Sequence, residues 1–163
     1  MSNGQYVVGS GTYSCGLYKY NESCQIIWCN KTFIDVIDLT VNNNNDNIIV
    51  SYRNVGVFVI DSDGDFLLSI SSSLSPPLSH TGGISVDKEG YLFICYFKSI
   101  LLFNPQYKFV KKLVTTQYKP YHVALCDNKY LAICGEDIDI YCTNDNNETD
   151  SDIVDIYCTD DNN

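Results

Sequence analysis

One segment near the middle of the chain, residues 82–113, constrains the fold more than any other. Apolar and polar residues alternate at 84–86, as in a half-buried strand. Residues 91–96 form a continuous apolar and aromatic run, short enough for a strand that is buried on both faces. A third apolar run covers 100–103, and a more polar run with three lysines covers 108–113. A glycine and a proline mark the turns between them, so the segment predicts four consecutive strands.

Weaker copies of this unit precede and follow it. The centres of the second strands are Val8, Val50, Ile94 and Ile133, which recur at a nearly constant spacing along the chain. A period of about 40 residues with several short strands per repeat is typical of a β-propeller, in which each repeat forms one blade. We therefore predict an all-β fold built of four-stranded antiparallel blades.

The predicted propeller-like domain covers residues 1–142, with blades at about 1–32, 33–75, 80–116 and 120–142. The first unit begins at its second strand, so the chain holds about three and a half blades. Three outcomes fit this count: a small four-bladed ring, a propeller closed by a second copy of the chain, or a truncated copy of a longer propeller. Open sheet faces bury little surface, which is why the incomplete count matters.

Residues 83–94 and 100–109 resemble a repeat of the NHL family of β-propellers. The resemblance lies in the Gly-Ile-Ser-Val-Asp strand, the acidic-Gly turn, the hydrophobic second strand and the Phe-Asn-Pro end of the third strand. Residues 97–99 depart from the family pattern, which has Asp and Asn-His-Arg between strands two and three. Residues 120–125 also resemble the start of such a blade. The resemblance implies a propeller fold, and it implies RNA as one class of partner because some members bind RNA.

The C-terminal residues 143–163 form an acidic tail rich in Asn and Asp. Within it, 154–163 repeats 138–147, with eight of ten positions identical. One interpretation is that the second copy supplies the strand missing from the first blade. The other is a recent tandem duplication whose second copy is loosely ordered.

Charge and composition bound the class of protein. Residues 1–135 contain ten basic and ten acidic residues, so the net charge of -10 comes from residues 136–163. Such an end repels nucleic acid and anionic membranes. The sequence has no apolar stretch of about 18 residues and no secretory signal at its start, so we expect a cytoplasmic chain without membrane contact. Its eight cysteines are then expected as reduced thiols.

A basic stretch is the first candidate site. No acidic residue lies between Glu89 and Asp127. Lysines contact phosphates and aromatic rings stack on bases, so this stretch is a candidate surface for single-stranded RNA. Its residues are Lys98, Lys108, Lys111, Lys112, Lys119, Tyr107 and Tyr118. The alternative is an ordinary solvated outer strand whose lysines discourage edge pairing.

Other candidate sites have weaker patterns. The acidic loop at 61–65 lacks the later ligands of a calcium-binding EF-hand loop and is predicted to be a plain turn. The cysteines show no zinc spacing. His122 lies just before a first strand, where the resemblance to lactonase-type and lyase-type propellers places metal ligands. It is therefore a speculative metal ligand, although Gly83 occupies the matching position of the preceding repeat.

The most direct interpretation is a non-enzymatic binding or scaffold module that meets a protein partner through propeller loops, with no cofactor. RNA binding through residues 98–119 is the first alternative, and a metal-dependent lactonase-like or lyase-like propeller is the second. The third is a truncated paralogue without an independent function. A second copy that closes the propeller is one expected partner.

Overall fold

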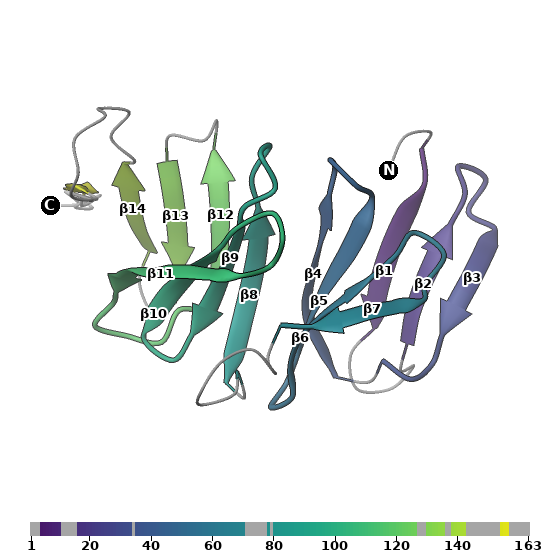
Figure 1. The fold of residues 1–163 in the computed structure, drawn as a ribbon, viewed down its shortest axis with the longest axis horizontal. Helices are drawn as coiled ribbons and strands as arrows, with labels where there is room; N and C mark the ends of the chain where they lie inside the picture. The colour runs from purple at the N-terminus through teal and green to yellow at the C-terminus, as the bar shows by residue number, and fades with distance from the viewer. Residues whose placement is uncertain are drawn as a thin grey trace, which may run out of the picture.

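The computed structural model of the chain describes residues 4–10, 16–33, 35–70, 78, 80–126, 130–135, 138–142 and 154–156. Within these residues the regular elements are all strands, arranged as four antiparallel sheets in chain order (Figure 1). No helix in this part of the chain is long and apolar enough to cross a membrane. The predicted all-β fold of propeller-type blades is confirmed.

Each sheet is a meander of consecutive strands. The first sheet contains β1 (Tyr6–Ser10), β2 (Gly16–Tyr20) and β3 (Ile26–Asn30). The second contains β4 (Val36–Asn42), β5 (Asn47–Tyr52), β6 (Gly56–Ile60) and β7 (Phe66–Ser69). The third contains β8 (Thr81–Val86), β9 (Leu92–Tyr96), β10 (Ser99–Phe103) and β11 (Phe109–Thr115). The fourth contains β12 (His122–Cys126), β13 (Tyr130–Cys134), β14 (Ile138–Cys142) and β15 (Val154–Ile156).

One type of turn recurs along the chain. After β6, Asp61 Oδ1 accepts backbone N–H groups two and four residues further on, at 2.9 Å each. Asn21 after β2 and Asn104 after β10 accept the same two bonds. Short polar side chains that bond their own backbone in this way specify turns. The loop at 61–65 thus forms the expected turn. Asp87 after β8 accepts the same two bonds, so this turn follows strands at more than one place in the sheets.

Packing between the sheets indicates that the first sheet begins at its second strand. β1 contacts β4 as β5 contacts β8 and β9 contacts β12. β1 is therefore equivalent to β5 and β9, and among the described residues the first sheet contains no counterpart of β4 or β8. The sequence also predicted that the first unit begins at its second strand, because strand candidates precede only three of the four second strands.

Three hydrophobic cores lie between successive sheets. Ile48 and Val50 of β5 face the first sheet, while Ile49 faces the third. In β9, Leu92 and Ile94 face the second sheet and Phe93 and Cys95 face the fourth. A continuous apolar run is what a strand buried on both faces requires. Each fully buried Ile or Leu contributes about 1.5–3 kcal/mol of transfer free energy.

Two side chains attach the first sheet to the second. Lys19 Nζ and Trp28 Nε1 both donate to the carbonyl of Ser62, at 2.7 and 3.0 Å. The indole of Trp28 lies against Gly64, where a Cβ would stand 3.2 Å from the ring. Gly64 has φ +91°, a conformation that favours glycine. The β6–β7 turn is thus shaped to receive the first sheet.

The first and fourth sheets lie at opposite ends of the molecule (Figure 1). The tail segment β15 pairs with β14, with Ile140 opposite Ile156. The interpretation in which this segment completes the first blade is therefore wrong in this structure. Pairing with β14, a near neighbour along the chain, closes a much shorter loop than pairing across the whole molecule, so it costs less chain entropy. The first three sheets lie within the blades expected at 1–32, 33–75 and 80–116, whereas the fourth extends beyond residue 142 through β15.

Candidate functional site

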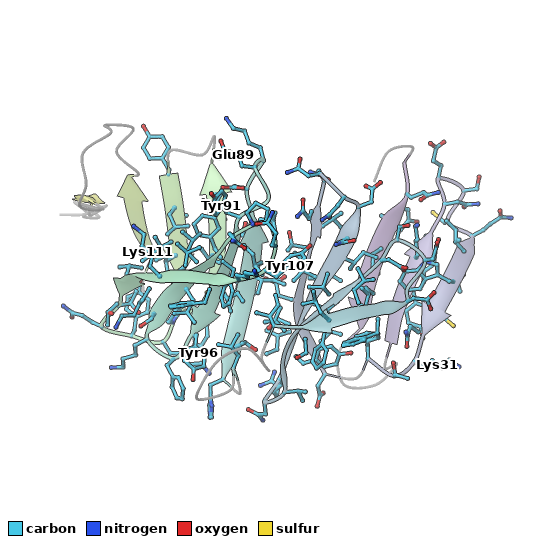
Figure 2. All side chains as sticks on the ribbon, in the orientation of Figure 1. Lys31, Glu89, Tyr91, Tyr96, Tyr107 and Lys111 are labelled. Carbon is cyan, nitrogen blue, oxygen red and sulfur yellow. The ribbon has the colours of Figure 1, made fainter. Side chains whose placement is uncertain are left out.

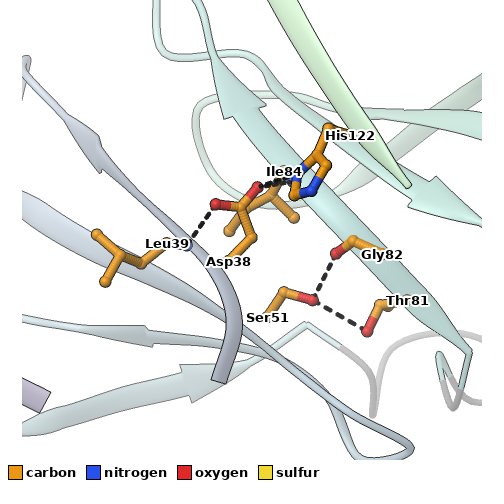
Figure 3. A network of polar contacts seen from close by, with 7 residues as sticks. All are labelled: Asp38, Leu39, Ser51, Thr81, Gly82, Ile84 and His122. Carbon is orange, nitrogen blue, oxygen red and sulfur yellow. Dashed lines mark hydrogen bonds and ion pairs between the residues drawn. The ribbon is translucent and has the colours of Figure 1, made fainter. Parts of the chain in front are cut away.

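The innermost strands of the second, third and fourth sheets bring one position of the repeat together. Asp38 in β4, Gly83 in β8 and His122 in β12 each precede the residue that pairs with the centre of the second strand. β8 packs between β4 and β12, and Gly83 lies beside both His122 and Asp38. Figure 3 shows Asp38 and His122 pointing toward each other across β8. We call these three residues the axial cluster.

Asp38 organises the axial cluster. Its carboxylate accepts the backbone N–H groups of Leu39 at 2.9 Å and Ile84 at 3.0 Å. Oδ2 of the same carboxylate lies 3.7 Å from Nδ1 of His122. One acidic side chain therefore joins strands from three consecutive sheets.

Gly83 makes this approach possible. A Cβ at this position would lie 2.7 Å from Cα of His122 and 2.8 Å from the carbonyl oxygen of Tyr121. With no side chain there, Gly83 N–H donates to that carbonyl at 2.6 Å. The glycine thus allows β8 and β12 to pack backbone against backbone, which carries His122 over β8 toward Asp38.

The axial cluster contains an imidazole and a carboxylate, which are fewer protein ligands than a catalytic metal site usually has. The side chain of His122 is 61% exposed and that of Asp38 is 27% exposed. Across the described part of the chain, no three His, Cys, Asp or Glu side chains come close enough to hold a metal ion. A catalytic zinc site has three protein ligands, so His122 with Asp38 supplies at most two of them.

Asp38 is not among the residues predicted from the sequence. There, His122 aligns with Gly83 in the preceding repeat, which offers no matching acid or base. The same alignment extended one repeat further places Leu39 with Ile84 and Val123, and so Asp38 with His122. The sequence therefore contained an acidic residue at the position equivalent to His122, but two repeats away from it.

Beside the axial cluster, two buried hydroxyl groups join β5 to β8 (Figure 3). Ser51 Oγ donates to the carbonyl of Gly82 at 2.8 Å and lies 3.1 Å from Oγ1 of Thr81. Thr81 Oγ1 is 3.2 Å from the carbonyl of Tyr52, to which it donates. Buried polar groups need such partners, so these residues position the strands and do not face a ligand.

The residues predicted to bind RNA do not form one continuous surface. Tyr107 is buried in the core between the second and third sheets, where its hydroxyl accepts from Nδ2 of Asn47 at 3.1 Å (Figure 2). A ring in that position cannot stack on a base. Lys98 Nζ donates to the carbonyl of Gln117 at 2.7 Å, and Tyr118 is partly buried.

The other predicted lysines are exposed on or next to the outermost strand of the third sheet. Lys111 and Lys112 are neighbours in β11, so their side chains point to opposite faces of the sheet. Lys108 precedes this strand and Lys119 follows it. Placement alone neither supports nor excludes RNA binding, which stays a prediction.

A tyrosine-rich surface covers the side of the first sheet that faces away from the second. We call it the first-sheet face; it consists of Tyr6, Val8, Tyr18, Tyr20, Ile27 and Cys29. Tyr6 and Tyr20 stack at 5.4 Å between ring centroids, and Tyr18 lies 6.4 Å from Tyr20. Tyr6 is 40% and Val8 44% exposed. The hydroxyl of Tyr6 donates to Sγ of Cys24 at 3.0 Å, and this hydrogen bond raises the pKa of Tyr6.

A cavity of about 410 Å³ opens between the end of the first sheet and the β5–β6 turn of the second. Four aromatic side chains line it, together with Asp35 and Arg53. None of these residues is predicted from the sequence. No motif signals them, because they come from β3–β4, β5–β6, β6 and β7 and meet only when the two sheets pack.

No family model matches this sequence, and no curated protein is similar to it at a significant level. Solved structures are similar in fold. A functionally unknown protein from Desulfotomaculum acetoxidans DSM 771 superposes with a TM-score of 0.67 at 16% identity, over 86% of this chain and 48% of that one. The WD40 β-propeller domain of Doa1 superposes with a TM-score of 0.68 at 13% identity, over 89% of this chain and 48% of that one.

This chain therefore spans just under half the length of each of these structures. At such low identity the likeness concerns the fold alone. Together with the four successive antiparallel sheets, it identifies the architecture as that of a β-propeller.

Proposed function

We propose that this chain is a protein-binding propeller module with repeats of NHL type, and that it is not an enzyme. One observation carries the proposal: the first-sheet face is apolar and aromatic, yet exposed. Exposed apolar patches of this kind mark interaction surfaces. Tyrosine is enriched at protein interfaces because its ring is apolar while its hydroxyl tolerates water.

We further propose that the protein covering this face is a second copy of the chain. Most of the chain superposes on just under half of the WD40 β-propeller domain of Doa1. Two copies related by a two-fold axis would then place the first sheet of each against the fourth sheet of the other. The far side of the fourth sheet carries the small side chains of Ala124, Ala132 and Cys134 next to the exposed ring of Tyr130.

The test is the mass in solution, measured by light scattering across a range of protein concentrations. We expect twice the 18.4 kDa of one chain at high concentration. Tyr18→Glu places a charge in the centre of the first-sheet face and should return the mass to that of one chain. Val110→Glu is the matched control, because Val110 is exposed on β11 in the third sheet, outside the first-sheet face.

Two results would contradict the proposal. A single-chain mass at every concentration would exclude the second copy as the partner. A dimer that survives Tyr18→Glu unchanged would show that the first-sheet face is not the interface. Circular dichroism of each variant separates loss of association from loss of fold.

A further inference from the structure

The cavity between the first and second sheets has the size of a ligand site. Its volume of about 410 Å³ lies within the range of about 300–1,000 Å³ that small-molecule and cofactor pockets occupy. None of its lining residues belongs to the first-sheet face, since its walls come from the end of β3, the β3–β4 connection and the second sheet. Any occupant is therefore independent of the proposed dimer.

An aromatic wall runs along this cavity from the interior to the surface. The rings of Phe33 and Tyr52 lie 5.2 Å apart, those of Tyr52 and Phe58 5.3 Å, and those of Phe58 and Phe66 6.1 Å. Phe33 is 7% exposed at the inner end and Phe66 is 60% exposed at the outer end. Such a wall accepts one large apolar or aromatic side chain through offset or edge contacts.

The polar side chains of the cavity divide into two groups. Asn30 Oδ1 accepts both the backbone N–H and the hydroxyl of Thr32, at 3.1 and 2.6 Å, and its Nδ2 donates to the carbonyl of Gly64 at 3.2 Å. Asn30 and Thr32 are thus occupied by the protein itself. They shape the rim and have little capacity left for a ligand.

Arg53 and Asp35 form the second group. The backbone N–H of Arg53 donates to the carbonyl of Asp35 at 3.2 Å, which holds both residues at the rim. Among the residues that the structure describes, neither the guanidinium nor the carboxylate has a hydrogen-bond or ion-pair partner, although both line the same cavity. An exposed guanidinium beside an aromatic wall is suited to a carboxylate, because charge-assisted bonds from Arg to carboxylate are strong and bidentate.

We propose that this cavity binds a peptide segment that presents one large apolar side chain next to a carboxylate. The apolar side chain lies along Phe33, Phe58 and Phe66. The carboxylate accepts from the guanidinium of Arg53, and a peptide N–H donates to the carboxylate of Asp35. The hydroxyl of Tyr52 stays protonated, because burial raises the pKa of Tyr52.

Two sources supply the same chemistry: a free C-terminus that ends in an apolar residue, or an acidic side chain beside an internal apolar residue. Three dye-labelled peptides distinguish them, measured by fluorescence anisotropy with the full chain. The first is Gly-Ser-Gly-Ser-Phe with a free C-terminus, and the second is the same peptide with an amidated C-terminus. The third is Gly-Ser-Phe-Glu-Gly-Ser with an amidated C-terminus.

We expect saturable binding of the first or the third peptide, and loss of at least tenfold in affinity on Arg53→Ala. Tenfold corresponds to about 1.4 kcal/mol, at the lower end of what a hydrogen bond to a charged group contributes. Phe66→Ser should weaken the same peptide by a similar factor. Lys31→Ala is the matched control, because Lys31 is exposed in the neighbouring β3–β4 connection and does not line the cavity.

The peptide that binds identifies the source of the carboxylate. Binding of none of the three would overturn the proposal, as would equal losses for Arg53→Ala and Lys31→Ala, which would indicate unspecific charge attraction. Equal binding of a peptide with Ser in place of Phe would overturn the role of the aromatic wall. Tyr18→Glu should leave peptide binding unchanged, so failure of the proposed dimer and failure of this site remain distinguishable.

Discussion

The first and second sheets place different residues at equivalent positions, and the difference follows from what lies beside them. The packing and register of the first two sheets place Tyr6 at the position of Ile48 and Tyr20 at the position of Ile60. Ile48 and Ile60 are fully buried because the first sheet packs on them, whereas Tyr6 is 40% exposed. The same strand position is thus core in one sheet and surface in the next.

The choice of side chains follows the same division. The faces of β5 and β6 that meet the first sheet are mostly aliphatic, which suits a dry and permanent core. The first-sheet face carries three tyrosines, whose hydroxyl groups can form hydrogen bonds with water. This composition supports the proposed protein interface on the first-sheet face.

The largest loss of stability is expected when the buried residue of this pair, Ile48, is truncated. Ile48→Ala removes a fully buried side chain from the core between the first two sheets. Such substitutions cost about 2–5 kcal/mol. Tyr6→Ala at the equivalent exposed position should cost under about 1 kcal/mol in a dilute solution of single chains. Urea unfolding of both variants measures the difference, and equal losses would contradict the assignment of Tyr6 to an open face.

The fold could be predicted from sequence because its signals are local and repeated. Strand alternation, turn residues and a nearly constant repeat length can be read within or between adjacent repeats, and the four copies reinforce one another. The contacts between repeats could not be predicted in the same way. The cavity aromatics and the neighbour of His122 depend on which faces of adjacent sheets meet, and the tail segment pairs with β14 because of its distance along the chain.

A second effect tests how closely the innermost strands pack. Gly83→Ala would put a Cβ 2.7 Å from Cα of His122, which is backbone and cannot rotate away. We expect a loss of about 1–3 kcal/mol, the usual cost of overpacking. A urea midpoint unchanged from that of the parent chain would show that β8 and β12 leave more room between them than this distance allows.

In the axial cluster, we expect Asp38 and His122 to contribute unequally to stability. Asp38→Ala removes a carboxylate that accepts two backbone N–H groups, so we expect a loss of about 1–3 kcal/mol. His122→Ala removes only an exposed side chain 3.7 Å from that carboxylate, and pairs of this kind contribute about 0–1 kcal/mol. If the two variants lost the same stability, the histidine and not the backbone amides would be the main partner of Asp38.

The last test uses labelling rates in place of stability. At the other end of the molecule, one of two equivalent cysteines is buried and the other is exposed. Cys95 in β9 and Cys134 in β13 occupy the same strand position one repeat apart. Cys95 is fully buried against the fourth sheet, and burial raises the pKa of Cys95 to about 12. Cys134 is exposed because, among the described residues, no further sheet follows the fourth.

Since the thiolate is the reactive form, a maleimide or aromatic disulfide reagent at pH 8 should modify Cys134 and leave Cys95 intact, as read by peptide mass mapping. Labelling of Cys95 at a comparable rate would mean that the third and fourth sheets separate readily.

Repeating the labelling at a higher protein concentration tests the proposed dimer as well. If a second copy covers the far side of the fourth sheet, labelling of Cys134 should slow. A Tyr18→Glu chain should keep the fast rate at both concentrations, because its first-sheet face can no longer cover Cys134 of its partner.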